Sequence, residues 1–94
     1  MKIAIIGTGN LGNSIAKGII ENNLYTTLYL TKRNINSLKK WEAFPKVYTT
    51  TSNVEAVQHA DILILAVQPK QLMPVLEEIK PLLNDKHYII STAT

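Results

Sequence analysis

The sequence contains no cysteine, so disulfide bonds and thiolate metal sites are excluded. Its two histidines, His59 and His87, stand far apart without a carboxylate cluster beside them, which argues against a metal site. The apolar run before Gly7 is too short for the core of a signal peptide. No segment approaches the roughly 20 apolar residues that span a bilayer. We therefore expect a cytoplasmic protein that makes no membrane contact.

The chain has little charge of either sign. Charged residues make up 18% of its 94 residues against 46% hydrophobic ones, which is typical of a globular domain. The net charge is +3, but the basic residues are spread along the chain, and the tightest groups are Lys32-Arg33 and Lys39-Lys40. A nucleic-acid surface needs a denser basic stripe with aromatic residues in it. We expect one domain over 1–94 that binds no nucleic acid.

Strand and helix signals alternate from end to end. Apolar or β-branched runs predict strands over residues 2–6, 26–31, 47–50, 61–67 and 87–91. Helical spacing predicts helices over 10–21, 34–41 and 52–59, and one that begins at Pro74, because proline suits a first helical turn. Ser52 and Glu55 have the spacing of a reciprocal capping box.

This alternation predicts an α/β protein with a parallel sheet covered by helices on both faces. By analogy with doubly wound Rossmann-type domains, we expect five strands in the order 3-2-1-4-5.

A glycine motif of the form G-x-G-x-x-G follows the first strand and opens the first helix. It consists of Gly7, Thr8, Gly9, Asn10, Leu11 and Gly12. In this context Gly7 permits a tight turn, Gly9 lets a pyrophosphate approach the backbone, and Gly12 lets the helix pack closely on the sheet. The helix N-terminus offers unpaired N–H groups and a partial positive charge to the phosphates. The motif predicts a dinucleotide site.

The end of the second strand indicates which dinucleotide is bound. NAD-binding domains usually carry an Asp or Glu there for the ribose 2′-hydroxyl, whereas this chain reads Thr31, Lys32 and Arg33. Arg33 can bind a phosphate with two hydrogen bonds, Lys32 adds a second charge, and Thr31 adds a hydroxyl donor. These residues predict a 2′-phosphate pocket, and therefore NADP with NADPH preferred over NADH.

Two further segments fall where such a cofactor would lie. Ligands of these sheets bind outside the carboxyl ends of the strands, so the exit of the fourth strand should line the cleft. It reads Ala66, Val67, Gln68 and Pro69. Asn53 has two interpretations: a residue of the first turn of its helix, or a ligand of the adenosine ribose.

Three segments together resemble the N-terminal domain of the pyrroline-5-carboxylate reductases: IIGTGNLGNSIAKGI, TTSNVEAVQHADILILAVQP and LEEIKPLL. That family reduces a cyclic imine to proline with NADPH or NADH. The resemblance implies that residues 7–12 bind the pyrophosphate and residues 31–33 the 2′-phosphate. It also implies that Asn53 binds the adenosine ribose and that the backbone of residues 66–69 binds the ribose next to the nicotinamide.

The chain departs from that family in two ways. Gln68 stands where the family usually has lysine, and the chain reads Ser91-Thr92-Ala93-Thr94 where the family continues with a small-residue stretch. The resemblance implies a helical C-terminal domain that is absent from these residues, and this domain supplies most of the imine site. No catalytic residue is therefore assigned, and we expect the fragment alone to be inactive.

Two alternatives remain open at the level of the sequence. A prephenate-type or deazaflavin-linked NADP reductase would have a similar N-terminal half, and a regulatory module would bind NADP without chemistry. Without a second domain, the apolar strand HYIIS at 87–91 should leave an exposed surface through which the chain self-associates.

Overall fold

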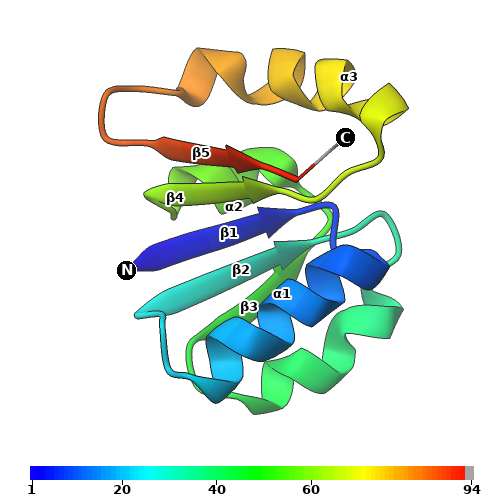
Figure 1. The fold of residues 1–94 in the computed structure, drawn as a ribbon, viewed down its shortest axis with the longest axis vertical. Coiled ribbons are helices and arrows are strands. Elements are labelled where there is room, and N and C mark those ends of the chain that lie inside the picture. The colour runs from blue at the N-terminus through cyan, green and yellow to red at the C-terminus, as the bar shows by residue number, and fades with distance from the viewer. Residues whose placement is uncertain (93–94) are drawn as a thin grey trace.

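The computed structural model describes residues 1–92 and contains one five-stranded sheet. The strands are β1 (Lys2–Ile6), β2 (Thr27–Thr31), β3 (Val47–Thr50), β4 (Ile62–Leu65) and β5 (Tyr88–Ser91). They run in the order β3-β2-β1-β4-β5, and every neighbouring pair is parallel. The predicted α/β class and strand order are confirmed (Figure 1).

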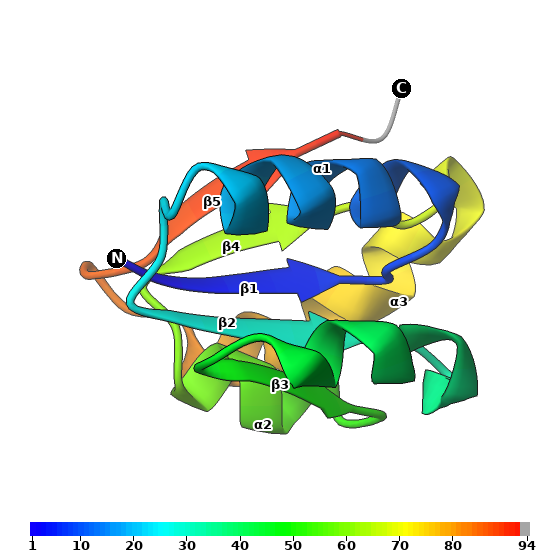
Figure 2. The ribbon, with the colours of Figure 1, turned by 90° about the horizontal axis from the view of Figure 1, so that it is seen from below.

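Helices connect the strands, as a parallel sheet requires. They are α1 (Asn10–Glu21), the 3₁₀ helix η1 (Ile35–Ala43), α2 (Asn53–Gln58), α3 (Pro69–Ile79) and the 3₁₀ turn η2 (Lys80–Leu82). Seen along the sheet, α1 lies on one side and α2 and α3 lie on the other (Figure 2). No helix within residues 1–92 is long and apolar enough to cross a membrane.

The strand residues alternate between two separate cores. Ile3 and Ile5 of β1 pack with α1 and with Leu38 of η1, whereas Ala4 and Ile6 pack with α2 and α3. The same alternation continues along β2 and β4. β1 and β4 are therefore buried on both faces, which is why their sequences are nearly continuous apolar runs.

The predicted start of the last helix, which is α3 in the structure, was wrong. α3 begins at Pro69 with Gln68 as its N-cap, so Pro69 rather than Pro74 occupies the first turn, and Pro74 lies inside the helix. Proline there cannot donate a hydrogen bond to the carbonyl four residues earlier, that of Lys70. Lys70 is exposed, so water can satisfy that carbonyl.

The predicted capping box of α2 is half formed. The side chain of Ser52 accepts a hydrogen bond from the backbone N–H of Glu55 at 3.1 Å, as the pattern predicts. The N–H of Ser52 donates to Thr50 Oγ1 at 3.0 Å rather than to the Glu55 carboxylate. Because the Thr50 hydroxyl already accepts the N–H of Ser52, the reciprocal half of the box is not made.

Strand β5 is much less covered than the central strands. Tyr88, Ile89 and Ile90 are 73%, 44% and 51% exposed. In the register of the sheet, Tyr88 lies beside Ile62 and Ile90 beside Ile64, which places both on the face that carries α1. α1 does not extend over β5 (Figure 1), so an apolar strip of the sheet faces outward.

Candidate functional site

The glycine motif forms a turn at the carboxyl edge of the sheet, tied to the end of β2. Gly7 has a positive φ of 80°, and its carbonyl accepts the N–H of Gly9 at 2.8 Å. The N–H of Gly7 donates to Thr31 Oγ1 at 3.1 Å, and the N–H of Thr8 donates to the Thr31 carbonyl at 2.7 Å. Two consecutive amides of the turn are thus bound by one residue of the neighbouring strand.

The three glycines of the motif differ in how closely the rest of the chain surrounds them. A Cβ at Gly7 would collide with Val67 Cγ1, and one at Gly12 would lie 3.3 Å from the Gly7 carbonyl oxygen and 3.4 Å from Ile5 Cγ2. A Cβ at Gly9 would meet nothing within 4 Å. Packing within the chain therefore constrains Gly7 and Gly12, while the space beside Gly9 is open to an approaching group.

The first turn of α1 presents its backbone to this open space. Gly9 is its N-cap, and no side chain in the described part of the chain caps it. Asn13 Nδ2 instead donates back to the Gly9 carbonyl at 2.9 Å, and Asn13 Oδ1 accepts from Trp41 Nε1 at 2.8 Å. Uncapped N–H groups at a helix start bind anions readily, so the turn and α1 together fit a phosphate group.

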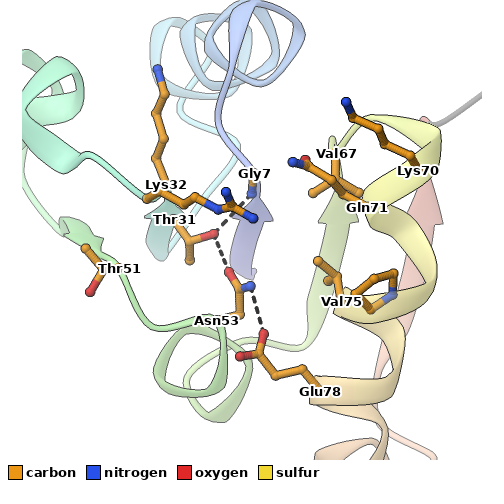
Figure 3. Close-up of a pocket in the computed structure, with 12 residues that line it drawn as sticks. Gly7, Thr31, Lys32, Thr51, Asn53, Val67, Lys70, Gln71, Val75 and Glu78 are labelled. Carbon is orange, nitrogen blue, oxygen red and sulfur yellow. Dashed lines mark hydrogen bonds between the residues drawn. The ribbon is translucent and has the colours of Figure 1, made fainter.

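A cleft of about 630 Å³ opens between the end of β2 and helix α3 (Figure 3). It brings together residues that lie far apart in the sequence. Its lining consists of Gly7, Thr31, Lys32, Arg33, Thr51, Asn53, Val67, Lys70, Gln71, Pro74, Val75 and Glu78.

Some of the predicted site residues line the cleft and others do not. It includes Gly7, Asn53, Val67 and the whole of 31–33. The rest of the glycine motif, 8–12, lies outside the lining, as do Ala66, Gln68 and Pro69. Thr8 is fully buried and donates its hydroxyl to the Ile5 carbonyl at 3.3 Å, so its side chain serves the turn itself.

The predicted basic residues form one wall of the cleft. Lys32 Nζ donates to Ser37 Oγ at 3.0 Å, and its side chain points toward η1 and away from the cleft (Figure 3). Arg33 is exposed. The Thr31 hydroxyl, predicted as a free donor, already donates to Asn53 Oδ1 at 2.6 Å. Arg33 is therefore the residue of this wall best able to reach an incoming phosphate.

The opposite wall comes from α3 and was missed in the sequence. Lys70, Gln71, Val75 and Glu78 project from successive turns of the helix, and Asn53 Nδ2 donates to Glu78 Oε1 at 2.9 Å. The i, i+4 spacing from Gln71 to Val75 and the i, i+3 spacing from Val75 to Glu78 place these residues on one helix face. That spacing could have identified the wall only if the start of α3 had been known.

One titratable group has a clearly shifted pKa, and it lies away from the cleft. Tyr29 stacks between Tyr48 and His59, with ring centroids 5.0 Å from each. Burial raises the pKa of the Tyr29 hydroxyl, and the nearby Glu55 and Tyr48 raise it further. A phenol with a raised pKa remains protonated at neutral pH, and Tyr29 is not among the residues that line the cleft.

These features define a class of protein. A parallel sheet in this order, with a glycine turn at the point where strand order reverses, is the pyridine-nucleotide-binding fold of oxidoreductases. The chain belongs to the family described as NADP oxidoreductase coenzyme F420-dependent, whose model matches residues 2–94.

Within this family the chain is similar to pyrroline-5-carboxylate reductases. It is 38% identical over 96 residues to pyrroline-5-carboxylate reductase 1 of Dictyostelium discoideum, covering 98% of this chain and 17% of that protein. The structure of a pyrroline-5-carboxylate reductase from Coxiella burnetii superposes with a TM-score of 0.89 at 34% identity, over 99% of this chain and 35% of that one. The resemblance predicted from the three sequence segments is confirmed.

A further structure carries a cofactor. The Plasmodium falciparum pyrroline carboxylate reductase with NADP bound matches with a TM-score of 0.81 at 27% identity, over 99% of this chain and 33% of that one. This chain therefore spans about a third or less of the length of these relatives.

The different constraints on the glycines predict opposite effects of alanine. Gly7→Ala should lower the free energy of unfolding by about 2 kcal/mol or more, because alanine resists positive φ and its Cβ collides with Val67. Gly18→Ala, inside α1 with open space around it, should raise that free energy by about 0.5–1 kcal/mol. Denaturant unfolding of both variants measures the two changes in the free energy of unfolding. Changes of the same sign and size would contradict the strained turn at Gly7.

Proposed function

We propose that this chain is the NADP-binding domain of an oxidoreductase that reduces a cyclic imine, as the pyrroline-5-carboxylate reductases do in proline biosynthesis. The observation that carries the cofactor assignment is the end of β2, where Lys32 and Arg33 stand in the position at which NAD-binding domains carry a carboxylate and where Arg33 is exposed at the cleft. The NADP bound to the Plasmodium falciparum relative supports the same cofactor.

The residues present fit a dinucleotide. The open space beside Gly9 and the uncapped first turn of α1 suit the pyrophosphate. Arg33 suits the 2′-phosphate, and Asn53, which lines the same cleft, suits the adenosine ribose. The nicotinamide ring supplies the hydride when it is bound, while this domain binds and orients the cofactor. The resemblance implies that most of the imine site lies in the part of the relatives that this chain does not span.

The first test is the discrimination between the two cofactors. We expect NADPH to bind more tightly than NADH in calorimetric titrations. Arg33→Ala should weaken NADPH binding by about 10-fold to 100-fold and leave NADH binding unchanged, since a hydrogen bond to a charged group contributes about 1.5–3 kcal/mol. Lys86→Ala removes an exposed lysine in the loop before β5 and should change neither affinity.

The outcomes of this titration separate the parts of the proposal. Equal binding of NADPH and NADH would remove the 2′-phosphate assignment of Lys32 and Arg33 and leave the dinucleotide site in place. Binding of neither would mean that these residues do not form a competent site by themselves. An equal loss of NADPH affinity in Arg33→Ala and Lys86→Ala would indicate a general effect of net charge.

A second test uses the open space at Gly9. Gly9→Ala should change the free energy of unfolding by no more than about 1 kcal/mol, because its Cβ meets no atom of the chain and only the N-cap preference is lost. The same methyl group occupies the proposed path of the pyrophosphate, so NADPH and NADH should both bind about tenfold or more weakly. Unaltered binding of both cofactors would place the pyrophosphate elsewhere.

The uncovered strip on β5 leads to a prediction about association. Tyr88 and Ile90 are exposed together on the face of β5 that α1 does not cover, and such apolar surface tends to self-associate. For the 94-residue chain, sedimentation should show a weight-average mass that rises with protein concentration. Ile90→Lys should reduce this rise. A monomer at all concentrations would contradict the prediction.

A further inference from the structure

A chain of hydrogen bonds crosses the cleft from α3 to the glycine turn (Figure 3). Asn53 Nδ2 donates to Glu78 Oε1 at 2.9 Å, and Asn53 Oδ1 accepts from Thr31 Oγ1 at 2.6 Å. Thr31 Oγ1 in turn accepts the N–H of Gly7 at 3.1 Å. Glu78 thus lies three hydrogen bonds from the backbone of the turn, although it stands 71 positions later in the sequence.

The chemistry of Glu78 fixes the direction of every bond in this chain. An ionised carboxylate can only accept hydrogen bonds, so the amide group of Asn53 must turn its NH₂ toward Glu78. The Asn53 oxygen then faces Thr31, and the single hydroxyl proton of Thr31 is donated to it. A lone pair of Thr31 Oγ1 is left for the N–H of Gly7. Without the carboxylate, the amide of Asn53 could rotate by half a turn and present its NH₂ to Thr31.

We propose that Glu78 is a positioning residue of the cofactor cleft, which holds the glycine turn in its binding shape through Asn53 and Thr31. The proposal rests on the proposed dinucleotide-binding function. Because the turn binds the pyrophosphate that NADPH and NADH share, Glu78 contributes equally to the affinity for both. In this respect it differs from Arg33, which acts on NADPH alone.

The surroundings of Glu78 favour this role over a contribution to the stability of α3. Its side chain is exposed, and within residues 1–92 no lysine or arginine forms an ion pair with it. Its hydrogen bond to Asn53 joins it instead to the cleft. The neighbouring Glu77 is also exposed on α3 and is not part of the cleft lining, so it provides a matched control.

The binding test compares three variants of the 94-residue chain by calorimetric titration. Glu78→Ala should weaken NADPH and NADH binding by the same factor, about twofold to tenfold, which corresponds to one hydrogen bond. Glu77→Ala should change neither affinity. Glu78→Gln should recover only part of the loss, because its amide oxygen can still accept from Asn53 but its NH₂ group also permits the reversed orientation of the Asn53 amide. A loss that Glu77→Ala reproduces, or one confined to NADPH, would overturn the proposal.

A measurement without cofactor tests the connection itself. In NMR hydrogen-exchange experiments, the Gly7 amide should exchange about twofold to tenfold faster in Glu78→Ala than in the unmodified chain and in Glu77→Ala. An unchanged Gly7 rate would overturn the connection from Glu78 to the turn.

The two measurements distinguish failure of this inference from failure of the proposed function. Faster exchange with unchanged cofactor affinity would overturn the positioning role alone. If the unmodified chain binds neither NADPH nor NADH, these residues do not form a competent site by themselves and the positioning role fails with that site, while the exchange rate still decides whether Glu78 orders the turn.

Discussion

Thr31 forms the contact on which the arrangement of the whole site depends. It is 1% exposed at the end of β2, and its carbonyl and hydroxyl oxygens accept the N–H groups of Thr8 and Gly7. Buried amides must be paired, and these two have left the ladder of β1 without having entered α1. By satisfying both, Thr31 lets the chain turn sharply between strand and helix. Within the part of the chain that the structure describes, no side chain caps the start of α1, so its first N–H groups are available to an anion.

This contact also explains why the turn tolerates no side chain at its first position. The exit of β4 brings Val67 against Gly7 from one side, while Thr31 holds the amides of the turn from β2 on the other. Between these two neighbours, the backbone of Gly7 adopts a positive φ that only glycine accepts readily. Where the strand order reverses, the side of the turn that contacts Val67 and Thr31 is therefore close-packed, and the side beside Gly9 is open. Such an arrangement suits the binding of a ligand by backbone groups.

The fold was predictable from the sequence because its signals are local. Apolar strands alternate with amphipathic helices, and the three-glycine motif has a defined place between one strand and the next helix. The start of α3 was not predictable from proline alone, because Pro69 and Pro74 both follow β4 and the sequence does not show which of them occupies the first turn. The α3 wall of the cleft was missed for the same reason. Glu78 resembles an ordinary exposed helix residue until the fold places it beside Asn53, 25 positions away.

The parts of the site differ in how firmly the chain itself holds them. The turn is shaped by buried groups and by hydrogen bonds internal to the domain, so its form does not depend on a ligand. The charged groups at the rim are different, since Arg33 is exposed and Lys32 is occupied with Ser37. A preformed backbone site lowers the entropy lost on binding, whereas an exposed arginine must be ordered by the phosphate it contacts. In the proposed complex, affinity would therefore come mainly from the turn and discrimination from Arg33. A related enzyme could then change its cofactor preference at the end of β2 without altering the fold that binds the pyrophosphate.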